Sequence, residues 1–150
     1  MNFLTDRRLI FFLRIGLGVL FLIAGIPKFL DPQAFATSIS HYQLLPEWGE
    51  RALALVLPPL EIAIGIALIV GVLDAGAAVL CFLLLIVFTG AIGISVARGL
   101  DISCGCFETE GGTKVGAKKL LENTAFIVAA YLVVIGDRSW LAVRSFFGRS

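Results

Sequence analysis

Two cysteines separated by a single glycine are the residues of this chain best suited to covalent chemistry. Cys104, Gly105 and Cys106 lie in the only strongly polar segment of the second half of the sequence, residues 98–119. A disulfide across one intervening residue closes a very small ring, so it is strained and easily reduced, which favours disulfide donation. Gly105 lets the backbone make the tight bend. The pattern predicts thiol–disulfide exchange by Cys104 and Cys106, with Gly105 in support.

Two other interpretations of the cysteine pair stay open. The two thiols can form a purely structural bond or remain unpaired in a loop. Two thiolates can also hold Cu(I), but Met1 is the only methionine and no third cysteine lies nearby in the sequence. We therefore expect no metal site, and we expect redox exchange ahead of a structural role.

A second pair with chemical potential, Lys28 and Glu61, lies within apolar segments. Ionisable residues inside membrane spans are costly and usually face the bundle interior or a partner of opposite charge. Because consecutive spans are antiparallel neighbours, Lys28 and Glu61 can pair across them. The pair is either structural or functional, as a proton relay or as the polar part of a quinone pocket. Arg14 lies towards the other end of its span and is expected to extend to the membrane interface instead.

Two further residues carry weaker signals. His41 is the only histidine and lies in a polar loop, so we expect it to be solvated. Cys81 lies within an apolar run, where a cysteine behaves as a small hydrophobic residue.

The composition places all of these residues in a membrane protein. Of the 150 residues 59% are hydrophobic and 15% charged, whereas soluble domains are about half apolar and about a quarter charged. One small domain cannot cover so much apolar surface. The net charge of +1 and the absence of a basic patch interleaved with aromatic residues exclude a nucleic-acid partner. Three cysteines are too few for a disulfide scaffold but enough for one redox pair.

The expected fold is an all-α integral membrane protein, a four-transmembrane-helix bundle formed as a single domain over residues 1–150. The predicted spans are residues 9–30, 53–72, 77–97 and 120–135. The first run is too long for a signal peptide and no clear cleavage site follows it, so we expect it to be retained. Phe35, Ile39 and Tyr42 recur at helical spacing and predict a short interfacial helix in the first external loop.

Small residues and prolines predict how the spans pack. Ala63 and Ala67, like Gly93 and Ala97, are four residues apart, a spacing that lets membrane helices approach closely. Pro58-Pro59 are expected in the first turns of the second span, where they would loosen or kink the helix.

Four spans place both termini on one side of the membrane. Lysines and arginines are almost equally divided between the two sides, but Arg7 and Arg8 flank the first span, which often dominates orientation. A thiol pair used for disulfide chemistry also belongs on the oxidising side. We expect cytoplasmic termini and an external Cys-Gly-Cys loop.

Four motifs carry a resemblance to a known family. They are Ala24–Phe29, Tyr42–Pro46, Pro59–Gly65 and Asp101–Phe107. Together they resemble the DoxX-like superfamily, and the Ser-Cys-Gly-Cys-Phe sequence of the last motif resembles the MauE family of methylamine-utilisation membrane proteins in particular. The resemblance covers nearly the whole chain, from about Arg14 to about Ile135.

The resemblance implies a multi-pass protein of the bacterial inner membrane whose Cys-Gly-Cys loop is periplasmic. It implies maturation of the disulfide-rich small subunit of methylamine dehydrogenase or a related thiol client, with a periplasmic thioredoxin-like partner. No cofactor is required, although a membrane quinone near Lys28 and Glu61 is a candidate. The outline is also similar to vitamin K epoxide reductase proteins, which carry Cys-x-x-Cys where this chain has Cys-x-Cys. The alternative is a non-catalytic membrane assembly or chaperone subunit that docks the thioredoxin-like partner.

Overall fold

The computed structural model describes residues 6–71, 74–99 and 117–147, and most of these residues are helical. The helices are α1 (Arg7–Leu30), α2 (Pro32–Ser40), α3 (Glu47–Val70), α4 (Asp74–Ala97) and α5 (Ala117–Phe147). Segments of α1, α3 and α4 are long and apolar enough to cross a membrane, while the apolar stretch of α5, Leu120–Gly136, is shorter. The predicted helical bundle is confirmed, and the fourth crossing stays a prediction.

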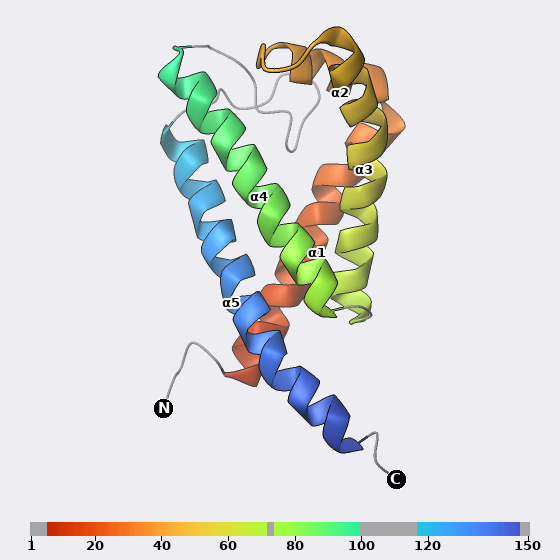
Figure 1. Ribbon diagram of the computed structural model, residues 1–150, viewed down its shortest axis with the longest axis vertical. Coiled ribbons are helices and arrows are strands. Elements are labelled where there is room, and N and C mark those ends of the chain that lie inside the picture. Colours follow the sequence, from red (N-terminus) through yellow and green to blue (C-terminus); the bar gives the residue numbers. More distant parts are fainter. Residues whose placement is uncertain (1–5, 72–73, 100–116, 148–150) are drawn as a thin grey trace.

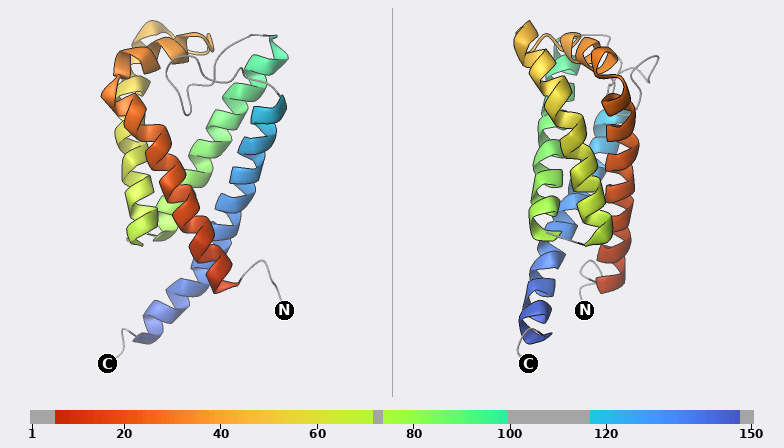
Figure 2. Two further views of the ribbon diagram at one scale, coloured as in Figure 1. Left: turned by 180° about the vertical axis from the view of Figure 1, so that it is seen from behind. Right: turned by 90° about the vertical axis from the view of Figure 1, so that its right-hand side faces the viewer.

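The long helices form two antiparallel pairs. Helix α1 packs beside α3, and α4 packs beside α5 (Figure 1). The two pairs diverge towards the end of the molecule that α2 covers, as two further views also show (Figure 2). The start of α1 and the end of α5 lie together at the opposite end.

The outward faces of the long helices are apolar. Phe12 is 70% exposed on α1, Val56 64% on α3 and Val87 65% on α4. A water-soluble monomer rarely exposes contiguous apolar surface on this scale, whereas lipid chains solvate it well. These faces identify a multi-pass membrane protein that contacts lipid.

Glycines bring α1 and α3 into close contact. A Cβ atom added to Gly18 would lie 2.8 Å from the carbonyl oxygen of Gly65, and one added to Gly65 would lie 2.8 Å from the carbonyl oxygen of Gly18. A Cβ on Gly25 would lie 3.1 Å from the Cβ of Glu61. We call this contact, with Gly18, Gly25, Lys28, Glu61 and Gly65, the α1–α3 seam.

The small residues predicted to mediate helix packing were largely the wrong ones. Ala63 and Ala97 are exposed, and a Cβ added to Gly93 would meet no atom within 4 Å. Spacing alone misled the prediction because a four-residue repeat of small residues marks one helix face without saying which neighbour, if any, lies against it.

Helix α3 begins at Glu47, before the predicted start at residue 53. Pro58 and Pro59 therefore lie in the interior of a continuous helix, and the prediction that they occupy its first turns is wrong. Glu47 and Glu50 stand in the actual first turn, where negative charge interacts favourably with the helix dipole. The helix therefore begins with a polar, acidic turn that precedes its apolar segment.

The short helix predicted in the first loop is present as α2, but it ends at Ser40, so Tyr42 of the predicted pattern lies beyond it. Asp31 caps it by accepting a hydrogen bond from the Ala34 backbone N–H at 3.0 Å, and Pro32 supplies the favourable first residue. Phe35, 3% exposed, anchors α2 against Ala54 and Leu57 of α3. Its position at the membrane surface stays a prediction.

Candidate functional site

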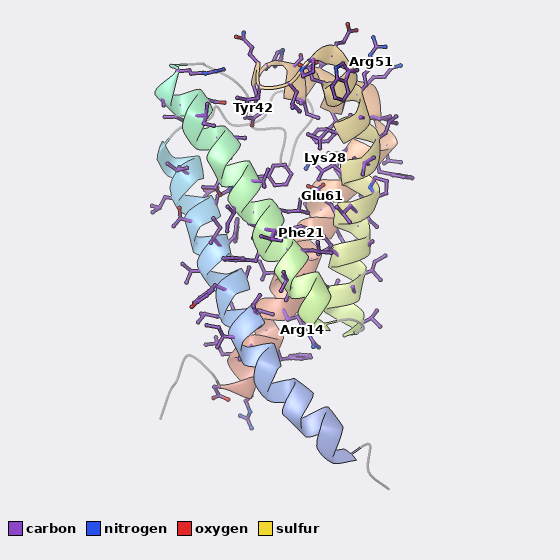
Figure 3. The ribbon with its side chains drawn as sticks, viewed as in Figure 1. Arg14, Phe21, Lys28, Tyr42, Arg51 and Glu61 are labelled. Atoms are coloured by element: carbon purple, nitrogen blue, oxygen red, sulfur yellow. The ribbon has the colours of Figure 1, made fainter. Side chains whose placement is uncertain are left out.

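Lys28 of α1 and Glu61 of α3 form a buried ion pair, which confirms that the two residues pair across adjacent helices. Lys28 Nζ donates hydrogen bonds to Glu61 Oε1 at 2.9 Å and to Oε2 at 3.0 Å. Each side chain is only 2% exposed. Figure 3 shows the two residues meeting between α1 and α3, in the half of the bundle nearer α2.

The sequence places this pair through the α1–α3 seam. Gly25 lies one turn before Lys28, and its missing side chain lets α1 approach the backbone beside Glu61. Lys28 also lies in the last turn of α1, where a cation interacts favourably with the carbonyl end of the helix. The close helix crossing thus fixes the two charges opposite each other.

Two aromatic rings complete the surroundings of the ammonium group. Lys28 Nζ lies 4.9 Å from the ring centroid of Phe35 and 5.2 Å from that of Phe88. An ammonium group has three N–H donors, and among the described residues Glu61 is the only hydrogen-bond acceptor for this one. The third N–H therefore makes no hydrogen bond to a described residue. The faces of the two aromatic rings still stabilise the positive charge of the ammonium group.

Asn123 of α5 joins this cluster, and the sequence reasoning missed it. It is 3% exposed and lines a cavity of about 30 Å³ together with Lys28, Glu61 and Phe88. Its side chain has no hydrogen-bond partner among the residues that the structure describes. The available signal was an amide within a predicted span, since polar residues there usually face the bundle interior.

A larger apolar cavity of about 240 Å³ lies between α2, α3 and α4, next to the ion pair. Phe35 and Phe88, whose rings flank Lys28 Nζ, both line it. The remaining lining residues are Ser38, Ile39, Tyr42, Leu44, Leu45, Leu53, Leu57, Val87 and Ala91. Phe88 lines both cavities, the smaller of which also contains the polar side chains of Lys28, Glu61 and Asn123.

The predicted redox residues, Cys104, Gly105 and Cys106, lie outside the described residues. The helix ends that flank their segment are described: α4 ends at Ala97 and α5 begins at Ala117, both at the end of the bundle that carries α2 (Figure 1). Arg98 Nη1 donates a hydrogen bond at 3.3 Å to the carbonyl oxygen of Gln43, which ties this end of α4 to the connection after α2.

Of the other residues considered in the sequence, His41 and Cys81 lie as predicted, whereas the extension of Arg14 to the membrane interface stays a prediction. His41 is exposed, and Cys81 is fully buried in the apolar core. Arg14 lies far from Glu61, towards the opposite end of the bundle, with its guanidinium carbon 5.7 Å from the centroid of the Phe11 ring (Figure 3). None of the three belongs to the Lys28–Glu61–Asn123 cluster.

Comparison with known proteins identifies a family. Residues 6–136 match the model of the family described as methylamine utilisation protein MauE. The chain is 34% identical over 136 residues to methylamine utilization protein MauE of Paracoccus denitrificans, covering 90% of this chain and 73% of that protein. No solved structure shows detectable similarity to this chain.

Other relatives carry the same name. MauE of Methylorubrum extorquens is 36% identical over 121 residues, covering 80% of this chain and 65% of that protein. MauE of Paracoccus versutus is 40% identical over 119 residues, covering 79% of this chain and 64% of that protein. The chain thus spans about two thirds to three quarters of the length of these three relatives.

Proposed function

Because the chain belongs to the MauE family of methylamine-utilisation proteins, we propose that it is a membrane thiol–disulfide protein that supports disulfide formation in a periplasmic client. The client class is a disulfide-rich protein such as the small subunit of methylamine dehydrogenase, reached directly or through a thioredoxin-like partner. The observation that carries the proposal is the Cys104-Gly105-Cys106 sequence, which lies inside the region that matches the family.

In the proposed reaction, a client thiolate attacks one sulfur of the Cys104–Cys106 disulfide, and the second client thiolate resolves the mixed disulfide. The client loses two electrons and two protons, and Cys104 and Cys106 become two thiols. Restoring the disulfide requires an acceptor for two electrons and two protons, which a membrane-soluble quinone held near Lys28 and Glu61 would supply by being reduced to a quinol.

The positions of the helix ends also support this proposal. Both helix ends that flank the cysteine segment lie at the α2 end of the bundle, whereas the start of α1 and the end of α5 lie at the other end. With the termini cytoplasmic in a bacterial inner membrane, the cysteines would then lie on the periplasmic side, where disulfides persist.

The test compares a Cys104→Ser/Cys106→Ser double variant with a Cys81→Ser control in cells that produce a disulfide-containing client. We expect the oxidised fraction of the client to fall to the level without this protein in the double variant and to remain at the wild-type level in the control. The measurement is a gel-shift assay of client thiols after acid quenching. Full client oxidation with the double variant contradicts the proposal and favours a non-catalytic assembly subunit that docks a thioredoxin-like partner.

Orientation is tested separately by labelling intact cells with a membrane-impermeant maleimide of high mass. In a Cys81→Ser background we expect Cys104 and Cys106 to be labelled from outside, and only after mild reduction. Labelling that requires permeabilised cells contradicts a periplasmic location.

A further inference from the structure

The cluster at the α2 end of the bundle contains hydrogen-bond donors that no described residue uses. Lys28 Nζ gives two of its three N–H groups to Glu61, and no other described residue accepts from it. The Asn123 amide is 3% exposed and has no described partner. These donors are therefore available to an acceptor atom of a bound molecule.

The small cavity that Lys28 and Asn123 line differs in size from the apolar cavity, and Phe88 lines both. The cavity beside Asn123, at about 30 Å³, is close to the space of one water molecule. The cavity beyond Phe88, at about 240 Å³, is much larger, and aliphatic and aromatic side chains form most of its wall. Water alone gains little from such a wall, whereas a compact apolar ring is well accommodated.

The larger cavity also connects with the lipid-facing surface. Val87 is 65% exposed, and Leu44, Leu45 and Leu53 are 37–43% exposed, although all four line the cavity. A molecule dissolved in the bilayer can therefore reach the cavity past aliphatic side chains, without crossing water.

We propose that this apolar cavity and the Lys28–Glu61–Asn123 cluster together bind a membrane quinone. The ring lies in the cavity against Phe35 and Phe88, the isoprenoid tail leaves past Val87, and a carbonyl oxygen accepts a hydrogen bond from Lys28, with Asn123 as the second donor. A rotation of the Phe88 side chain, of the kind common on ligand binding, joins the two cavities. This inference rests on the proposed function, because thiol oxidation at Cys104 and Cys106 requires a two-electron acceptor.

The charges of the cluster suit the reduction of such a molecule. A quinone gains two electrons and two protons, and negative charge develops on its carbonyl oxygens as electrons arrive. Lys28, already paired with Glu61, would act there as a hydrogen-bond donor to the oxygen on which that charge develops. The two protons released by the Cys104 and Cys106 thiols balance the two that the quinone takes up. A lipid acyl chain satisfies neither donor, because it has no acceptor atom inside the cavity.

The test measures binding of decylubiquinone to the full chain in lipid nanodiscs, with a nanodisc lacking protein as the reference for partition into lipid. We expect saturable binding by wild type and equally by the Cys104→Ser/Cys106→Ser variant. Ala91→Phe fills the cavity and should weaken binding by about tenfold or more, and Asn123→Leu removes one donor and should weaken it by about five- to tenfold. Ala97→Phe, exposed on the same helix, and Thr124→Val, exposed on α5, are matched controls expected to stay within about twofold of wild type.

Three outcomes overturn the inference. They are binding no greater than lipid partition, binding unaffected by both Ala91→Phe and Asn123→Leu, and equal competition by decanol, which shares the alkyl chain but lacks the ring. If Ala91→Phe does not fold, as judged by gel filtration and thermal unfolding, Ala91→Leu replaces it.

The same preparations separate this inference from the proposed function. Pre-oxidised wild-type protein should oxidise one equivalent of client dithiol without any quinone. If that single turnover occurs but no quinone binds, only the quinone site fails. If quinone binds in the cavity but the double serine variant still supports client oxidation in cells, only the thiol–disulfide function fails.

Discussion

The α1–α3 seam and the outward surface of the bundle use the same residue types for opposite purposes. In the seam, Gly65 touches the backbone of α1 and Glu61 is only 2% exposed. On the outward surface, a Cβ added to Gly93 would meet no atom within 4 Å, and Glu47, paired with Arg51 on the same helix as Glu61, is 77% exposed. Burial, rather than residue type, therefore determines what a glycine or an ion pair contributes.

The largest difference between the two regions should come from their ion pairs. Glu61→Leu leaves the Lys28 ammonium group buried without its carboxylate, and removing one partner of a buried pair costs about 3–5 kcal/mol. The measurement is thermal unfolding in detergent, followed by the reaction of a thiol-specific dye with Cys81, which is fully buried in the folded protein. A Cys104→Ser/Cys106→Ser background leaves Cys81 as the only thiol.

A second substitution distinguishes loss of the pair from loss of packing. In the Lys28→Met/Glu61→Leu double variant no charge is left unpaired, so much of the lost stability should return, because apolar residues of similar volume often replace a buried pair at little cost. If the double variant is as unstable as Glu61→Leu alone, the unpaired Lys28 charge is not the cause of the instability. The contrast drawn with the exposed ion pair would then be wrong.

Matched alanine substitutions at two glycines should give the next largest difference. Gly65→Ala places a Cβ 2.8 Å from the Gly18 carbonyl oxygen, and relieving such a backbone clash costs about 1–3 kcal/mol. Gly93→Ala meets open space, and alanine favours helix by up to about 1 kcal/mol relative to glycine. The dye assay should show a lower unfolding temperature for Gly65→Ala and an equal or higher one for Gly93→Ala. Equal destabilisation by both would show that the seam is no tighter than the lipid-facing surface.

This contrast also marks what the sequence could predict. The helices and the Lys28–Glu61 pair followed from composition, length and the cost of intramembrane charge, which depend on each segment and its adjacent span. The contact glycines did not follow, because Gly18, Gly65 and Gly93 look alike in sequence and differ only in what lies opposite them. The first turns of α3 were missed because Glu47 and Glu50 are polar, and the prediction followed the apolar run alone.

The candidate site shows the same limit. Lys28 and Glu61 were identified because charge in an apolar segment is conspicuous, whereas the neutral Asn123 was overlooked in α5. The apolar cavity was beyond prediction, because it arises where α4 diverges from α3 beneath α2, and divergence is a property of the packed bundle. Cys104 and Cys106 stay a prediction from sequence, since they lie outside the described residues.

The smallest expected effect is at the exposed pair Glu47–Arg51, which completes the comparison with Lys28–Glu61. Both side chains are more than 70% exposed, and the two residues lie one helical turn apart. Glu47→Gln keeps the shape of the side chain and removes its charge, so the loss is that of an exposed ion pair and of one first-turn acid, together about 1 kcal/mol or less. Salt screens exposed charges, so adding 0.5 M NaCl (an ionic strength of about 0.5 M) should reduce even this difference in unfolding temperature, whereas the effect of Glu61→Leu should persist. A Glu47→Gln variant as unstable as Glu61→Leu would mean that exposure does not set the strength of the two pairs, and that the first turn of α3 carries a contact beyond its ion pair.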